Sequence, residues 1–114
     1  MTDRELLELA AKAAGYYYHG HRTRSATSDK PGYENCYVST TNDTDDWFVW
    51  SPLTDDGDAL RLAVKLEMDV MCASVRTDCG IVETIQAGTD IYAATRRAIV
   101  RAAAAITQDG GART

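Results

Sequence analysis

The chain has 114 residues, a formal net charge of −5 and 45% hydrophobic residues, which is the size of a single domain. Alanine supplies 17 of the apolar residues, so we expect a thin core between closely packed, alanine-rich helices. The longest apolar run, residues 102–106, is far shorter than the roughly 20 residues that a membrane span needs, and no basic, then apolar, leader opens the chain. An isoelectric point near 4.8 argues against general binding to nucleic-acid backbones.

The first predicted elements are a helix and a short strand. Apolar residues at helical spacing follow a capping residue, Thr2 or Asp3, and Gly15 can end the helix. Three adjacent tyrosines, residues 16–18, predict a strand because aromatic side chains suit a pleated, half-buried surface. The apolar positions of the helix are Leu6, Leu7, Ala10, Ala13 and Ala14.

A polar segment and a second strand follow. Residues 22–32 are mostly small and polar and end in Lys-Pro-Gly, which predicts a loop. Residues 33–41 predict a strand with Cys36 and Val38 on one face.

The densest apolar cluster of the chain is Trp47-Phe48-Val49-Trp50, which follows an acidic turn at residues 42–46. We interpret the cluster as the end of a strand that is either core or an exposed contact surface. Because a small domain short of apolar volume gains by burying more between subunits, the cluster makes self-association an expectation.

The second helix is predicted to start at Thr54. Asp55, Asp56 and Asp58 fall in its first turn, where carboxylates meet the positive end of the helix dipole. The predicted buried stripe consists of Ala59, Leu60, Ala63, Val64 and Leu66.

The segment between the second and third helices predicts a β-hairpin with a definite register. A three-residue turn at residues 78–80 places glycine in the left-handed position and sets Val75 opposite Glu83. A two-residue turn would pair apolar with polar residues, so we prefer the longer one. The predicted apolar side carries Met71, Ala73, Val75, Ile81 and Ile85.

The last helix is predicted to begin at Thr89 or Asp90 and to end before Asp109, with residues 109–114 as a flexible tail. Its predicted buried face carries Ile91, Ala94, Ala98, Ala102 and Ile106. We therefore predict a single α+β domain over residues 1–108. In it, helices pack on a small antiparallel sheet in an α/β/α sandwich-like arrangement, in the order α-β-(β)-α-β-β-α.

Two segments carry a resemblance to a known family. Trp-Ser-Pro-Leu-Thr-Asp-Asp-Gly-Asp-Ala-Leu-Arg-Leu-Ala at residues 50–63 and Ala-Thr-Arg-Arg-Ala-Ile at residues 94–99 are similar to the phage ABA sandwich family of bacteriophage and prophage proteins. The likeness runs roughly from Glu5 to Ile106 and is weak over residues 16–44, where this chain carries a longer insert with tyrosines and histidines. The resemblance implies phage or prophage origin and helix–sheet–helix layering. It implies no catalytic residues, because the family has no assigned activity.

The first of these segments also has a structural interpretation of its own. Leu53 precedes the predicted cap and would pack on the first helical turn as a hydrophobic staple. Pro52 fixes the approach of the chain, and Gly57 permits close contact between the helix start and its neighbour. We interpret the motif as a structural cap formed by Trp50, Pro52, Leu53, Thr54, Asp55, Asp56, Gly57 and Asp58.

Aspartates and histidines raise the question of a metal site. Six aspartates lie within residues 43–58, but they lack the alternating spacing and the distal glutamate of a calcium loop. His19 and His21 can share a strand face, with Cys36 as a third ligand, but no second close pair of zinc ligands exists. We therefore predict no metal and no cofactor. We interpret the acidic run as a solvated loop and the histidines as a polar or interfacial pair that can respond to pH.

The three cysteines, Cys36, Cys72 and Cys79, form an odd set without metal-ligand spacing. In the preferred hairpin register, Cys72 lies about 20 Å from Cys79, which is too far for a disulfide. A nucleophilic centre would need Cys36 or Cys79 beside His19 or His21, and nothing in the sequence places them together. No phosphate-binding glycine loop or serine elbow occurs either, so we predict that the protein is not an enzyme.

Arginines and tyrosines supply a second function hypothesis. Arginines of the last helix and tyrosines of the first strand could form an aromatic, cationic pocket for an anionic small molecule such as a signalling nucleotide. The alternative is that the arginines neutralise the acidic segment and interact with helix carbonyls. The residues of this hypothesis are Arg96, Arg97, Arg101, Tyr16, Tyr17 and Tyr18.

Beside these patterns, the resemblance to the phage family implies a small accessory protein that acts in the host cytoplasm by binding and without catalysis. Its expected partners are itself, as a homo-oligomer, and a host or phage protein. Sequestration of an anionic small molecule is the alternative function, and a metal-dependent hydrolase is the third.

Overall fold

The computed structural model describes residues 2–23, 34–41, 47–86, 88 and 90–108. Its helices are α1 (Asp3–Ala13), α2 (Asp56–Lys65) and α3 (Ile91–Gln108). Its strands are β1 (Tyr17–Thr23), β2 (Glu34–Ser39), β3 (Phe48–Val49), β4 (Asp69–Val70), β5 (Ser74–Arg76) and β6 (Val82–Thr84).

Three parts of the sequence prediction lie partly or wholly outside this description. The first two residues of the loop predicted at 22–32 belong to β1, and the other residues of that loop are not among the described ones. The acidic turn at 42–46 and the tail at 109–114 are not among them either.

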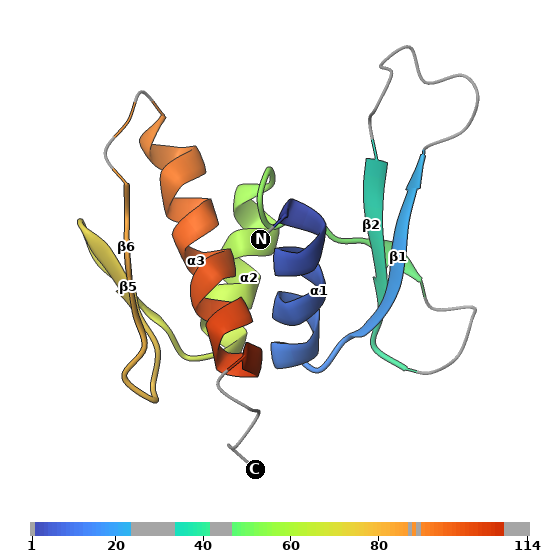
Figure 1. Ribbon diagram of the computed structural model, residues 1–114, viewed down its shortest axis with the longest axis horizontal. Coiled ribbons are helices and arrows are strands. Elements are labelled where there is room, and N and C mark those ends of the chain that lie inside the picture. Colours follow the sequence, from blue (N-terminus) through green and yellow to red (C-terminus); the bar gives the residue numbers. More distant parts are fainter. Residues whose placement is uncertain (1, 24–33, 42–46, 87, 89, 109–114) are drawn as a thin grey trace.

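The three helices occupy the middle of the molecule, and a small sheet lies on either side of them (Figure 1). β1, β2 and β3 form one antiparallel sheet beside α1, and β4, β5 and β6 form the other beside α3. The predicted α+β class is confirmed, with two small antiparallel sheets where the sequence predicts one. No helix of the described ranges combines the length and the apolar character that crossing a lipid bilayer requires.

Alanine faces allow α1 and α3 to pack along each other. Thr2 caps α1 by accepting a hydrogen bond from the Glu5 amide at 3.2 Å, and Gly15 ends the helix with a φ of +80°. Asp90 caps α3 by accepting from two amides of its first turn, at 3.0 and 3.1 Å. Nine of the nineteen buried apolar residues of the described chain are alanine, which confirms the predicted alanine-rich core.

The first sheet joins the helices through a buried strand face and an aromatic cluster. Cys36 and Val38 are both buried in the core, as their alternation predicts. The Tyr16 ring meets Phe48 and Trp50 edge-on, with centroids 5.7 Å apart in each pair. Of the predicted aromatic cluster, Trp50 is therefore core, whereas Phe48 remains partly exposed at its edge.

The second sheet contains the predicted hairpin in the predicted register. Val75 lies opposite Glu83, and the Thr77 amide donates to the Ile81 carbonyl at 2.8 Å. Gly80 has a φ of +92°, the left-handed conformation that a three-residue turn requires. Val75 and Ile85 are buried on the side that faces α3.

The prediction that Met71 and Ala73 belong to the apolar side of the hairpin is wrong, because both residues are exposed. The chain turns once more after β4, with the Met71 amide donating to the Ser74 carbonyl at 2.8 Å, so that β4 pairs with β5 as a third strand. This turn ends the alternation on which the prediction relied, and it leaves Met71 44% exposed at the edge of the sheet.

The predicted start and buried stripe of α2 also need correction. Asp55, not Thr54, is the N-cap, because its carboxylate accepts from the Asp58 amide at 2.8 Å. Leu60 and Val64, predicted to be buried, are 62% and 68% exposed, and Leu62 is the large buried residue at 2%.

The prediction that Gly57 permits close contact with a neighbouring element is also wrong. A side chain at this position would meet Arg61 and Asp55, which belong to the same helix and its cap. The glycine therefore does not serve close packing against a neighbouring element.

Candidate functional site

Arg96 and Arg97 tie α3 to the other two helices. Arg96 Nη1 donates to Asp56 Oδ1 at 2.6 Å, and its Nε donates to the Leu53 carbonyl at 3.0 Å, which joins α3 to the start of α2. Arg97 donates to both carboxylate oxygens of Asp3 at 3.0 and 3.3 Å, which joins α3 to the start of α1. Both guanidinium groups are thus committed to carboxylates of this chain.

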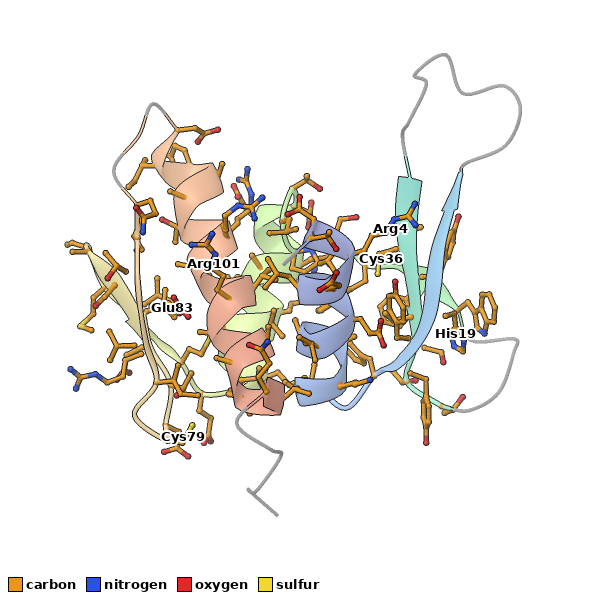
Figure 2. The ribbon with its side chains drawn as sticks, viewed as in Figure 1. Arg4, His19, Cys36, Cys79, Glu83 and Arg101 are labelled. Atoms are coloured by element: carbon orange, nitrogen blue, oxygen red, sulfur yellow. The ribbon has the colours of Figure 1, made fainter. Side chains whose placement is uncertain are left out.

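The tyrosines lie elsewhere. Tyr16 contributes its ring to the aromatic cluster and has the Lys65 ammonium 5.1 Å from its centroid. Tyr17 is exposed on β1, and Tyr18 packs against the core. Figure 2 shows Arg101 on α3, with α1 between it and the sheet that contains β1. The structure therefore does not bring the arginines and tyrosines together in one pocket.

The segment from Trp50 into α2 is a cap with several mutual hydrogen bonds. Trp50 and Pro52 are buried, and the Ser51 amide donates to Asp58 Oδ2 at 2.9 Å. Because Asp58 also receives Arg61 Nη1 on its other oxygen at 3.1 Å, its carboxylate is fully used within the cap. These contacts favour a structural role for the motif.

Ser39 and His19 are within hydrogen-bond distance, yet their geometry does not activate a nucleophile. His19 Nε2 lies 2.7 Å from Ser39 Oγ, and its ring stacks on Trp47 with centroids 3.9 Å apart. Ser39 Oγ donates its single proton to the Thr41 carbonyl at 2.5 Å, so His19 must be the donor to Ser39. A general base would have to accept that proton instead. The pair therefore holds the end of β2 in place.

The thiols do not supply a reactive centre either. Burial raises the pKa of Cys36 from 9.0 to about 12, so this thiol stays protonated at neutral pH. Cys72 and Cys79 are exposed, and none of the three cysteines forms a disulfide in the structure. Cys79 lies at the hairpin tip, 3.2 Å from Thr77 Oγ1, far from His19 in Figure 2.

Potential metal ligands do not gather within the described ranges, where no group of three or more His, Cys, Asp or Glu side chains could hold an ion. The backbone of His21 is paired with that of Cys36, but the histidine side chain lies outside the description. Asp55, Asp56 and Asp58 serve the cap and the ion pairs of α2.

The surface of the described residues includes an apolar groove of about 360 Å³ between α2, α3 and β4. Its floor and one edge include the small residues Ala59 and Thr95 and the ion pair of Asp56 with Arg96. Its walls are large apolar side chains that stand out into solvent: Leu60, Val70, Ile91 and Tyr92. Ile91, predicted to be buried, is thus exposed on the wall of the groove.

Exposed apolar side chains continue beyond the groove. Val64 lies one turn after Leu60 on α2, and Met71 follows Val70 in the chain. We use the term apolar patch for the resulting set: Leu60, Val64, Val70, Met71, Ile91 and Tyr92. It contains six of the ten exposed large hydrophobic residues of the described chain.

The groove exists because α3 extends past its neighbours. Arg96 and Arg97 contact the first turns of α2 and α1, so the five preceding residues of α3 lie beyond both helices. At 1.5 Å per residue, this overhang is about 7 Å long, and Figure 1 shows α3 projecting past the other two helices. Ile91 and Tyr92 therefore lie on the exposed end of α3, where they line the groove together with Leu60 of α2.

Sequence reasoning missed this site because it placed Leu60, Val64 and Ile91 in the core. One signal was available in the sequence. α2 carries large apolar residues on both faces, with Leu62 opposite Leu60 and Val64, so one of the two faces had to remain outside the core.

Comparison with known proteins adds no relative. A scan against protein-family models finds no match, and searches of curated proteins and of solved structures find none either. The resemblance to the phage ABA sandwich family therefore stays a prediction.

Proposed function

We propose that the protein is a non-catalytic interaction module that binds protein surfaces through the apolar patch. The groove at its centre is the observation that carries this proposal, because exposed apolar surface around a recess is typical of interaction sites. Catalysis is disfavoured by the protonated Cys36 thiol and by the proton that Ser39 commits to Thr41.

Self-association and a host or phage protein as partner belong to the same proposal. The phage or prophage setting is implied by the resemblance alone, and a cytoplasmic location follows from the sequence prediction alone. We do not extend the proposal to an anionic small molecule, since Arg96 and Arg97 are paired with Asp56 and Asp3. Tyr17 and Tyr18 belong to β1, and α1 lies between that strand and α3 (Figure 1).

An apolar fluorescent dye tests the patch without knowledge of the partner. Anilinonaphthalene sulfonate is titrated into the protein at submicromolar concentration, where the patch is free of other copies. We expect Leu60→Glu to weaken dye binding at least tenfold, because a carboxylate then stands in the groove wall.

Val82→Glu is the matched control. Like Leu60, Val82 is an exposed aliphatic side chain, but it lies outside the apolar patch. It belongs to β6, at the edge of the second sheet opposite β4. Dye binding that is unchanged by Leu60→Glu, or weakened equally by both substitutions, would contradict the proposal.

A further inference from the structure

The apolar patch has the shape of a surface that can bind its own copy. Tyr92, 70% exposed, and Leu60 project at the rim, while Ala59 and Thr95 leave a recess beside them. A two-fold contact uses the same surface on both subunits, so it requires a projection and a matching recess within one patch. Resting on the proposed function, we infer that a second copy of this chain occupies the patch, with Tyr92 of each copy entering the groove of the other.

The size of the patch agrees with a weak dimer. Its six side chains are 44–70% exposed. At roughly 100 Å² for each, the patch offers on the order of 600 Å² per copy and 1,200 Å² in total. That total is the lower end of specific protein interfaces. A dissociation constant on the order of 10 µM is therefore expected.

The charges around the groove permit contact between two copies. Each chain carries a net charge of −5, so a contact that placed acidic surfaces together would be repulsive. In the groove, Asp56 is neutralised by Arg96, whose side chain is largely buried. The occupant must therefore supply apolar surface, and the described part of this chain carries its largest set of exposed apolar side chains here.

Sedimentation equilibrium of the full chain between 1 and 500 µM tests the inference. We expect a monomer–dimer equilibrium, with Tyr92→Ala raising the dissociation constant at least about 30-fold because the tyrosine acts twice in each dimer. Leu60→Glu should have the same effect, and Val82→Glu should leave the equilibrium unchanged. Far-ultraviolet circular dichroism checks that each variant is folded.

A photoreactive benzoylphenylalanine at position 92 tests the geometry independently. After irradiation at 200 µM, we expect a covalent dimer whose cross-link joins position 92 to residues of the partner's groove, such as Ala59 or Ile99. Mixing isotopically labelled and unlabelled chains distinguishes this link from one within a single chain.

The outcomes separate this inference from the proposed function. A monomer at 500 µM whose groove still binds the dye would overturn the dimer and leave the interaction module standing. A dimer whose dissociation constant is unchanged by both Tyr92→Ala and Leu60→Glu would show that another surface forms the contact. That result would overturn the inference as well. A monomer without groove-dependent dye binding would refute both.

Discussion

Truncating Leu62 and Leu60 in turn tests the orientation of α2 and, with it, the origin of the apolar patch. Leu62 is 2% exposed and is among the largest fully buried side chains, whereas Leu60 is 62% exposed on the same helix. Removing a buried leucine to alanine costs about 2–5 kcal/mol, because transfer free energy is lost and a cavity remains. For Leu62→Ala we expect about 3 kcal/mol, or a melting temperature lower by roughly 12 °C.

Leu60→Ala should change the free energy of unfolding by less than about 0.5 kcal/mol, since leucine and alanine differ little in helix propensity. Urea unfolding followed by circular dichroism at about 1 µM measures both variants below the expected dimer concentration range. The side chains at the two positions point in directions about 160° apart around the helix, so the comparison is sensitive to rotation of α2 about its own axis. Equal losses, or a larger loss for Leu60→Ala, would refute the orientation and remove the basis of the patch.

Three further predictions concern the cap, the buried thiol and the hairpin turn. Asp55→Ala should lower the free energy of unfolding by about 1 kcal/mol, whereas Thr54→Ala should change it by less than about 0.5 kcal/mol. Urea titration measures both values. A larger loss for Thr54→Ala than for Asp55→Ala would show that Thr54 is the cap. Burial raises the pKa of Cys36 from 9.0 to about 12, so this thiol stays protonated in the folded protein and ionises in the unfolded one above pH 9. As the pH rises above 9, the free energy of unfolding should therefore fall more steeply in the parent chain than in a Cys36→Ala chain, by about 1.4 kcal/mol per pH unit. Equal pH dependence in the two chains would show that the thiol is accessible to solvent. Gly80→Ala, at a φ of +92°, should cost about 1 kcal/mol, and Gly88→Ala, which has open space around it, should be nearly neutral; similar losses would contradict the left-handed turn.

The hairpin register was predictable because two local features determine it together. The loop length places Gly80 in the left-handed position, and a shift by one residue would turn Val75 away from α3. The alternation carried no information about where the strand ends. Met71 continues the apolar pattern, but no glycine or proline marks the turn between β4 and β5, and the third strand went unpredicted.

The division of the strands between two sheets was not predictable for a different reason. Alternation tells which residues share a face, as Cys36 and Val38 do, but it does not tell which other strand supplies the hydrogen bonds. That choice depends on α2, which lies between β3 and β4 in the chain, and on the layer of helices that lies between the two sheets in space (Figure 1).

The candidate site depends on a relation between helices that no single segment contains. The sequence places arginines at 96 and 97, and adjacent positions on a helix point about 100° apart, so they can reach two different neighbours. Only the fold shows that these neighbours are the first turns of α2 and α1, and therefore that α3 begins five residues too early to be covered. Alanine on the inner faces lets the helices approach closely and leaves few large side chains to fill a core. Large residues such as Tyr92 that lie on the overhang are then exposed, and the binding that we propose for this protein rests on that mismatch in helix length.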